Sequence, residues 1–349
     1  MPSRMLPEWT DQDAVLLAWP HEASAWAPWI GAIEATYRNL AAAIARFEPL
    51  VVLCRDGDHA AATRAQLTLA GISPTRYRIA EQPFDDTWVR DYGPLARASD
   101  GQVELLDFRF NGWGGRHPAE RDDGVNAGLA AAGWFATPLL EESRILEGGA
   151  VETDGTGTLL LTRRSQFAPG RNDDPDEATA EAWLTEKLGV DRVLWLEHGG
   201  LKGDDTDGHV DTLVRFADTT TLIHQHCDDP DDPHYDPLSA LAAELTELRT
   251  ADDQPYALHP LPWPRPQYDE QGERLPATYA NFLLVNGGVI APTYNDAADT
   301  EALAVLQRCF PDREVVGVDA RNLLLQAGSV HCATMQLPSG ALAAEPGVD

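Results

Sequence analysis

Cysteine is scarce in this sequence, and its four copies are far apart. Cys54, Cys227, Cys309 and Cys332 are the only cysteines among 349 residues, and their spacing follows no regular pattern. Disulfide-stabilised secreted domains carry dense, regularly spaced cysteines. The sequence therefore gives no disulfide framework and is typical of a reducing compartment, so we expect a cytoplasmic protein.

Long hydrophobic runs are absent as well. The apolar stretch 282–292 is broken by asparagine, glycine and proline. It is well short of the ~20 residues that a membrane-spanning helix needs. The first nine residues contain no apolar stretch followed by a cleavage site of small residues. We therefore expect neither a membrane span nor secretion.

Basic residues are few relative to acidic ones. The chain has 26 Lys and Arg against 56 Asp and Glu, which gives a formal net charge of −30. Such a charge repels the phosphates of nucleic acids and the anionic surface of membranes. We therefore expect neither as a partner and favour a small cationic one. Acidic runs such as 227–234 are typical of solvated loops, so part of this charge needs no ligand to explain it.

The remaining composition is that of a globular protein. Hydrophobic residues make up 43% of the chain, enough for a substantial core at this length. No low-complexity linker divides the sequence, so we expect one domain over residues 1–349. The stretch 251–274 is rich in proline and polar residues and is expected to be an exposed loop.

Short apolar runs alternate with amphipathic segments along the chain. Runs rich in β-branched residues and leucine predict strands at 14–18, 49–53, 103–107, 158–161, 193–196, 221–225, 282–285, 289–291 and 314–318. Apolar residues at three- and four-residue steps predict helices at 32–47, 60–70, 176–188, 237–248 and 299–310. This order predicts a mixed α/β fold. Its strand-strand-helix rhythm returns about every 60 to 75 residues, the scale of a pseudo-symmetric array.

The stretch 203–211 is the most informative part of the chain for function. It places four aspartates around one histidine, His209, next to a predicted strand. Carboxylates this close repel one another and resist burial, so they are typical of sites that bind a cation or move a proton. His209 and Asp211 are two residues apart and would point to the same side of an extended strand, which indicates a shared task.

Cys332 is the best candidate for a nucleophile. Cys54 follows a predicted strand and Cys309 lies in a predicted helix, where packing explains them, whereas Cys332 lies among glycine, serine and histidine. A thiol needs a base to act as a nucleophile. The neighbouring His331 would point to the opposite face of an extended segment, so His209 is the better candidate for that base.

Two further segments carry candidate carboxylates. Trp88, Arg90 and Asp91 precede a Gly-Pro turn, and Glu147 leaves an apolar run just before two glycines that allow close backbone approach. An aspartate at a turn is common for local hydrogen-bonding reasons. Each segment alone is therefore open to a purely structural explanation.

A metal site is the alternative to a thiol site. His224 and His226 would lie on one face of a strand, with acidic loops following, as in some zinc or calcium sites. No second pair has ligand spacing, and the aspartates at 204–208 lack the twelve-residue calcium loop with its terminal glutamate. The residues favour no metal. A Gly-x-Ser-x-Gly elbow is also absent, which argues against a serine hydrolase.

Six motifs in order, together with residues 7–9 and 18–20 near the start, closely resemble the agmatine deiminase family, which is related to the microbial peptidylarginine deiminases. The motifs lie at residues 88–94, 110–114, 147–149, 203–211, 278–282 and 330–332. The resemblance implies the pentein fold, a five-bladed αβ propeller of pseudo-symmetric ββαβ units around a central active site. It also implies hydrolysis of agmatine to N-carbamoylputrescine and ammonia, in the synthesis of putrescine and other polyamines. It implies no metal or organic cofactor, and a homodimer.

The resemblance also implies roles for single residues. It makes Cys332 the nucleophile, His209 the general acid and base, and Glu147 the carboxylate that orients His209. Asp91 and Asp211 become the pair that holds the guanidinium. Two carboxylates on the N–H edges of a guanidinium localise its charge toward the central carbon, which makes attack by a thiolate feasible.

The resemblance also suggests which residues select the substrate. By the same resemblance Trp88 lines the substrate channel and Asp205 binds the distal amine, whereas no role follows for Asp204 or Asp207. Residues 161–172 differ from the stretch that many relatives carry after the Glu-Gly-Gly motif. A deiminase of free or peptidyl arginine, and a non-catalytic polyamine-binding protein, are the alternatives.

Overall fold

The computed structural model describes residues 3–344, and over this range the chain is mixed α/β. Its strands form five sheets of three or four strands, with the orders β1-β5-β6-β7, β10-β9-β8, β11-β12-β13, β16-β17-β18 and β19-β2-β3-β4. One further sheet has two strands, β14 (Gln267–Tyr268) and β15 (Arg274–Leu275). No helix within residues 3–344 has both the length and the apolar composition to cross a membrane.

The five larger sheets share one local pattern. In the sheet of β11 (Val214–Asp218), β12 (Thr221–Gln225) and β13 (Ala257–Leu261), the first two strands are antiparallel and the last two are parallel. Parallel neighbours require a crossover, and α8 (Tyr235–Glu247) provides it. Each sheet is thus an antiparallel pair followed by a strand that a helix returns in parallel.

The other four sheets repeat this order with different lengths. One sheet is built from β16 (Leu283–Val285), β17 (Gly288–Thr293), α9 (Asp299–Cys309) and β18 (Glu314–Asp319), and a second from β8 (Glu152–Thr153), β9 (Thr158–Thr162), α7 (Glu177–Leu188) and β10 (Arg192–Leu196). A third is built from β5 (Leu95–Ser99), β6 (Gln102–Arg109), α5 (Val125–Ala131) and β7 (Leu139–Ile145). The fourth joins the two ends of the chain, with β19 (Met335–Pro338) beside β2 (Gln12–Ala18), followed by α1 (Ile30–Ala45) and β3 (Leu50–Cys54). Two sheets gain an extra strand. β1 (Arg4–Met5) pairs with β5, and β4 (Tyr77–Glu81) follows α2 (Gly57–Leu69) and pairs with β3.

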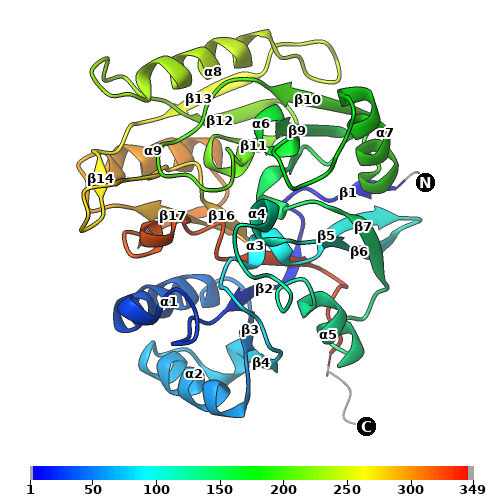
Figure 1. Cartoon of the computed structure of the whole chain (residues 1–349), viewed down its shortest axis with the longest axis vertical. Helices are drawn as coiled ribbons and strands as arrows, with labels where there is room; N and C mark the ends of the chain where they lie inside the picture. The colour runs from blue at the N-terminus through cyan, green and yellow to red at the C-terminus, as the bar shows by residue number, and fades with distance from the viewer. Residues whose placement is uncertain (1–2, 345–349) are drawn as a thin grey trace.

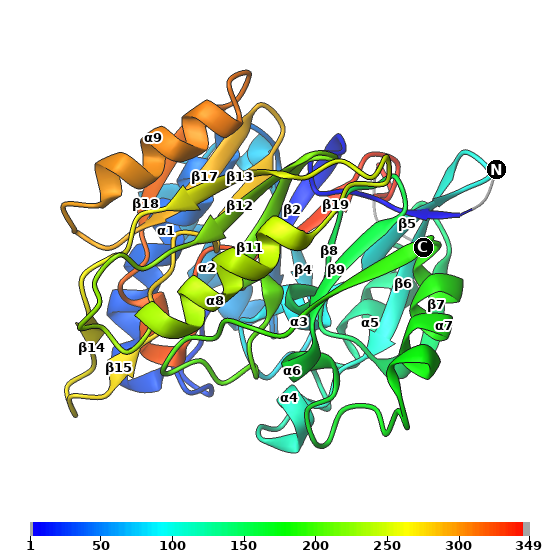
Figure 2. The same cartoon turned by 90° about the horizontal axis from the view of Figure 1, so that it is seen from above.

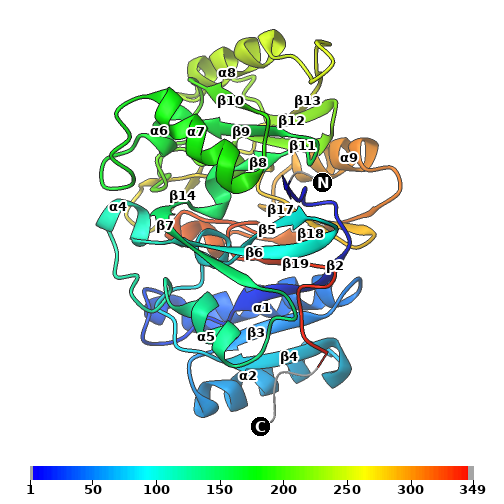
Figure 3. The same ribbon diagram turned by 90° about the vertical axis from the view of Figure 1, so that its right-hand side faces the viewer.

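The longer helices lie toward the outside of the molecule. Figure 1 shows α1 and α2 at the bottom, α8 at the top, α9 on the left and α7 on the right, and Figure 2 and Figure 3 show α8 and α9 on outer faces as well. The short helices α3 (Val89–Tyr92) and α4 (Gly112–Gly115) lie near the middle of Figure 1. Figure 2 shows α4 at the edge of the molecule and α3 further in.

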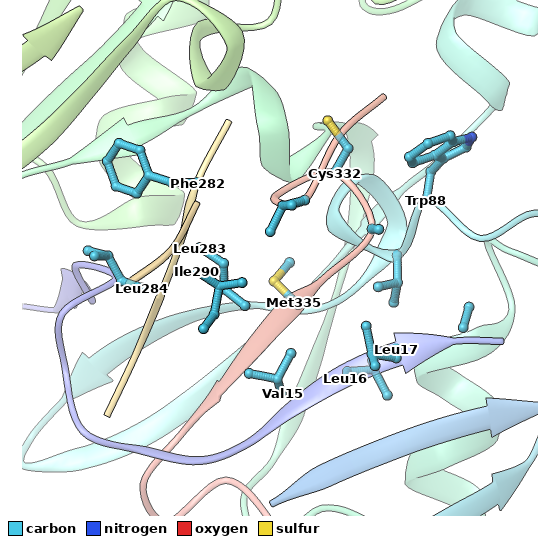
Figure 4. Close-up of a cluster of buried hydrophobic side chains, with 14 of the residues drawn as sticks. Val15, Leu16, Leu17, Trp88, Phe282, Leu283, Leu284, Ile290, Cys332 and Met335 are labelled. Atoms are coloured by element: carbon cyan, nitrogen blue, oxygen red, sulfur yellow. The ribbon is translucent and has the colours of Figure 1, made fainter. Parts of the chain in front are cut away.

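The core is built from strands that are buried on both faces. In β2 every residue from Ala14 to Ala18 is buried, as expected for a strand covered on both sides. Figure 4 shows Val15, Leu16 and Leu17 of this strand near Met335 of β19 in one apolar cluster. Such strands read as continuous apolar runs, which explains why the sequence predicts them.

Most predicted elements are present, with shifted ends. The predicted helix 60–70 is α2, which begins three residues earlier because the Asp56 side chain caps it by accepting a hydrogen bond from the backbone N–H of His59. The prediction of an exposed loop over 251–274 is wrong where β13 and β14 form, whereas most of the other residues in the stretch are exposed or half-exposed and lie outside strands and helices. β13 lies inside that stretch as an edge strand. Proline cannot donate a hydrogen bond to a neighbouring strand, and an edge strand has a neighbour on one side only, so Pro260 is tolerated there.

Candidate active site

Cys332 lies in a turn between the short 3₁₀ helix Leu323–Gln326 and β19, and its side chain is buried. Figure 4 shows its sulfur pointing out of the apolar cluster, with Trp88 on a neighbouring segment. A Cβ added at Gly328 would lie 2.2 Å from the Trp88 ring, so only glycine leaves room for the indole there. The turn and the indole thus enclose the thiol.

Asn281 fixes the turn that carries the thiol. Its Oδ1 accepts hydrogen bonds from the backbone N–H groups of His331 (3.0 Å) and Cys332 (3.3 Å), and its Nδ2 lies 3.2 Å from Cys332 Sγ. The same Nδ2 donates to Asp211 Oδ2 at 3.1 Å. Asn281 belongs to the 278–282 motif, but the sequence alone assigns it no role.

The thiol has a strongly raised pKa. Burial is the largest cause, and the carboxylates of Asp211 and Asp91 add to it; Asp211 Oδ2 lies 3.7 Å from the sulfur. Both effects disfavour the thiolate. Cys332 is therefore protonated at neutral pH until a positive charge enters the site.

His209 lies between two carboxylates. Its Nε2 is 3.2 Å from Glu147 Oε2, and its Nδ1 is 3.5 Å from Asp91 Oδ1. Burial lowers the pKa of His209, but Asp91, Glu147 and Asp211 outweigh it and raise the pKa to about 9. The imidazole is thus positively charged at neutral pH and able to act as an acid.

The expectation that His209 and Asp211 share one face of a strand is wrong. His209 precedes a 3₁₀ helix, Val210–Thr212, so the segment is a tight turn. Asp211 nevertheless contributes to the charge around His209, because the turn folds the two side chains into one site. The spacing argument gave the correct neighbours from the wrong backbone conformation.

Asp91 lies on α3 and is held by two donors. The backbone N–H of Gly149 binds its Oδ1 at 2.9 Å, and the indole N–H of Trp113 binds its Oδ2 at 2.9 Å. Burial raises the pKa of Asp91. A Cβ at Gly149 would lie 2.7 Å from His209 Nδ1, 2.9 Å from Asp91 Oδ1 and 3.0 Å from Asp211 Oδ2. Gly149 therefore lies where these three side chains converge.

Asp211 is fully buried, and among the described residues only one of its two carboxylate oxygens has a hydrogen-bond partner. Its Oδ2 is 2.7 Å from His331 Nδ1, whereas its Oδ1 has no hydrogen-bond partner within the described residues. Burial raises the pKa of Asp211, but His331, His209 and Arg215 outweigh it and lower the pKa. His331 does not belong to an extended segment, as assumed from the sequence. It lies in the turn before β19 and contacts Asp211 directly.

A narrow pocket leads to the thiol. Its cavity of about 20 Å³ is lined by Trp88, Asp91, Trp113, Asp205 and Cys332, among others. Burial and the neighbouring Asp204 raise the pKa of Asp205 to about 6. A space of this size holds little more than one water molecule. A longer ligand therefore requires side chains at the pocket to move.

The structure also gives contacts to residues without an expected role. Arg171 donates to Glu147 Oε2 at 2.7 Å, to Asp207 Oδ2 at 2.6 Å and to the Thr206 carbonyl at 2.9 Å. Asp207, whose φ is +65°, also binds Arg116 at 2.7 Å. Arg171 lies in the divergent stretch 161–172, and that divergence is the only sequence signal that pointed to this region.

Asp204 stabilises the same loop by hydrogen bonds to residues that follow it. Its Oδ1 accepts from the Thr206 hydroxyl at 2.6 Å, and its Oδ2 accepts from the Gly208 backbone N–H at 2.6 Å. An aspartate that binds backbone groups a few residues ahead stabilises a turn. Asp204 therefore shapes the loop that carries Asp205.

One group of possible metal ligands is found within residues 3–344, formed by Glu8, Glu152 and His331. Arg215 ion-pairs with both carboxylates, with its Nη2 2.5 Å from Glu8 Oε2. A guanidinium already supplies the positive charge there, so this donor set does not fit a metal ion. His224 belongs to no such group within those residues, although its ring centroid lies 6.2 Å from that of His226.

Comparisons of sequence identify relatives of this chain. A family model described as Porphyromonas-type peptidyl-arginine deiminase matches residues 4–338. Agmatine deiminase of Pseudomonas aeruginosa (strain LESB58) is 36% identical over 368 aligned residues, covering 96% of this chain and 95% of that protein. Agmatine deiminase of Stutzerimonas stutzeri (strain A1501) is 35% identical over 362 residues, with the same coverage.

Comparisons of structure give the same result. Agmatine deiminase of C. jejuni, with a cysteine changed to serine and substrate bound, superposes with a TM-score of 0.90 at 32% identity and covers 97% of each chain. Agmatine deiminase of Enterococcus faecalis superposes with a TM-score of 0.87 at 28% identity, covering 97% of this chain and 96% of the other. The chain therefore belongs to the Porphyromonas-type peptidyl-arginine deiminase family.

Proposed function

We propose that the protein is an agmatine deiminase, a hydrolase that converts agmatine and water into N-carbamoylputrescine and ammonia, as a step toward putrescine. The observation that carries this proposal is the placing of Asp91 and Asp211, both buried, around one point beside the Cys332 thiol. Relatives at 35–36% identity over nearly the whole chain bear the name agmatine deiminase.

The guanidinium is the natural ligand for these two carboxylates. Asp211 Oδ1 is buried without a partner in the described part of the chain, so it is available to accept from an N–H edge. Asp91 is fixed by Gly149 and Trp113 and faces the same point. Charge-assisted bonds to both edges hold the planar group with its central carbon presented to Cys332.

Binding of the substrate prepares the nucleophile. The pKa of Cys332 is raised by burial and by Asp211 and Asp91, so a cation held by those carboxylates offsets the cause of the shift. The thiol passes its proton to solvent only when the guanidinium is in place, because His209 is already protonated. In the free site the neutral thiol reacts more slowly with alkylating agents and oxidants than a thiolate would.

The chemistry then proceeds in two half-reactions. The thiolate adds to the guanidinium carbon, forming the C–S bond, and His209 donates its proton to the terminal nitrogen as that C–N bond breaks and ammonia leaves. The enzyme then holds a covalent S-alkylthiouronium. Water attacks the same carbon while neutral His209 accepts one of its protons. Collapse then breaks the C–S bond and releases the thiolate, and the remaining hydroxyl proton passes to solvent as the C=O of the urea product forms.

Glu147 keeps His209 suited to both steps. Its carboxylate lies 3.2 Å from Nε2, so it fixes the ring and leaves Nδ1, which has no hydrogen-bond partner within the described residues, facing the reacting groups. Burial raises the pKa of Glu147, but His209 and Arg171 outweigh it and lower the pKa. Glu147 therefore stays ionised while His209 changes its charge.

Asp205 and Trp88 account for the choice of agmatine. Both line the pocket, and a carboxylate there attracts the distal ammonium of agmatine but repels the α-carboxylate of free arginine. Ammonia release from agmatine, free arginine and a blocked arginine peptide tests this. We expect agmatine to have the highest kcat/KM; faster turnover of either arginine substrate would overturn the assignment.

We also propose that the five larger sheets are the blades of a pentein propeller that forms one domain over residues 1–349. The repeated ββαβ order and the outward placing of α1, α7, α8 and α9 support this (Figure 1). The family resemblance further leads us to propose a cytoplasmic homodimer. A sedimentation experiment that returns the mass of a single chain would contradict the dimer.

A further inference from the structure

A second buried cluster of charged side chains adjoins Asp211. It contains Glu8, Arg90, Glu152, Arg215 and His331, which come from five separate segments of the chain. His331 is completely buried and joins this cluster to the proposed active site. None of the steps above uses Glu8, although it is the one member whose side chain retains appreciable exposure, 19%.

His331 bridges two carboxylates. Its Nδ1 lies 2.7 Å from Asp211 Oδ2, and its Nε2 lies 2.6 Å from Glu8 Oε1. An ionised carboxylate only accepts hydrogen bonds, so each ring nitrogen in this geometry carries a proton. The other neighbour of Nε2 is an Arg215 nitrogen at 3.1 Å, which is itself a donor. The bridge is therefore a cation held between two anions.

The charges of the whole cluster balance only with that cation. Glu8 pairs with Arg90 at 3.2 Å and with Arg215 at 2.5 Å, and Glu152 pairs with Arg215. With Asp211, three carboxylates then face two guanidinium groups and one imidazolium. A buried charge without a partner is costly, so removal of the Glu8 charge leaves the cluster unbalanced and weakens the bridge from His331 to Asp211.

We propose that Glu8 is a positioning residue of the deimination reaction, acting through His331 to keep Asp211 ionised for the guanidinium. This inference rests on the proposed function. Burial raises the pKa of Glu8, but Arg215, His331 and Arg90 outweigh it and hold the pKa well below its ordinary value. Glu8 also lines a separate cavity of about 60 Å³ with Arg90, Glu152 and Gln336, so the cluster is reached without passing the thiol.

The test is the pH dependence of agmatine binding in a Cys332→Ser background, which prevents turnover. Glu8→Gln keeps the shape of the side chain but removes its charge. Loss of the Glu8 charge weakens the support that His331 gives Asp211, so the pKa of Asp211 rises from its lowered value and binding is lost at a higher pH on acidification. We expect the pH at which affinity falls on acidification to be higher than in Cys332→Ser alone, with no change in affinity at pH 8.

Two variants serve as controls. Glu8→Asp keeps the charge and should lose affinity at the same pH as the background variant. Glu104→Gln removes a half-buried carboxylate from its pair with Arg97 elsewhere and should leave the affinity profile unchanged at every pH. If Glu8→Gln loses affinity at the same pH as the background variant, or loses it equally at every pH, the inference is overturned. Failure of the wild-type protein to turn over agmatine would instead overturn the proposed function.

Discussion

Arg171 pairs with Glu147 inside the protein, with its Nε 2.7 Å from Glu147 Oε2, although 24 residues separate them in the sequence. Both side chains are almost completely buried. The same guanidinium binds Asp207 and the Thr206 carbonyl, so it connects the partner of His209 to the loop that carries Asp205. The proton-transfer pair and the substrate loop thus share one arginine.

Arg171→Gln should slow turnover and move its pH profile. Without the guanidinium, the negative charge of Glu147 is less compensated, so the pKa of Glu147 rises and that of His209 rises further above about 9. A weaker acid protonates the leaving ammonia less readily, and we expect kcat to fall about tenfold. The alkaline limb of the kcat profile should move to higher pH, as measured by ammonia release.

Arg109→Gln is the matched control, because Arg109 pairs with Asp123 at the surface and is 62% exposed. We expect its profile to match that of the wild type. The buried Arg171 pair should also matter for stability, with a loss of about 3–5 kcal/mol in the free energy of unfolding. A variant that unfolds more easily but keeps its alkaline limb would show that Arg171 has a structural role alone.

Cys332→Ser should abolish turnover while agmatine still binds. A hydroxyl is a poor nucleophile in the absence of a base at its side, so we expect kcat to fall on the order of 10³-fold or more. Asp91 and Asp211 are unchanged, so calorimetry should detect agmatine binding of nearly wild-type affinity. Cys309→Ser is the control, since Cys309 lies in α9, is half-buried and lines no pocket near the thiol.

The same measurement separates the alternatives to a thiol mechanism. Full turnover by Cys332→Ser would exclude Cys332 as the nucleophile, and a binding protein without activity would show no ammonia release even in the wild type. A metallohydrolase would lose activity with a chelator. We expect activity to persist with a chelator and to be lost after iodoacetamide treatment, faster at higher pH because the pKa of Cys332 is raised.

The strands that the sequence predicts are those whose burial leaves a simple pattern. β2 is apolar throughout because both its faces are covered, and it was found, whereas β13 carries Pro260 and a half-exposed His259 and was mistaken for a loop. An edge strand pairs with a neighbour on one side only and therefore tolerates proline and polar residues. Its composition can then resemble that of a loop. Its identity depends on β12, which lies more than 30 residues earlier.

The candidate site divides in the same way. Cys332, His209 and Asp211 stand out because they lie in polar or charged stretches of the sequence that packing in a core does not explain. Asn281 and Arg171 do not stand out, since their importance comes from partners 51 and 24 residues away. Whether a buried polar group is satisfied is a property of the folded chain. Such supporting residues are therefore seen only when the segments are placed together.

Gly149→Ala should damage catalysis without harming the fold broadly. The added Cβ would approach His209 Nδ1, Asp91 Oδ1 and Asp211 Oδ2 to within 2.7–3.0 Å, so these groups have to separate. Displacement of reacting groups by about 1 Å costs on the order of 100-fold in rate. Gly31→Ala is the control, because a Cβ there meets nothing within 4 Å. A Gly149→Ala enzyme with wild-type kcat would show that this point is not where the substrate lies.

Asp122→Asn should stabilise the protein more at pH 8 than at pH 5. Asp122 is buried, and burial raises its pKa to about 8 although its Oδ1 accepts from the backbone N–H groups of Asp85 and Asp86. In the unfolded chain the same carboxyl ionises near pH 4, so the folded state binds the extra proton and loses stability as the pH rises from about 4 to 8. An asparagine oxygen can accept both hydrogen bonds without a charge, so the variant escapes this loss. Denaturant unfolding at the two pH values should give a difference of at least about 1 kcal/mol; an equal effect at both would mean that Asp122 is already ionised in the fold.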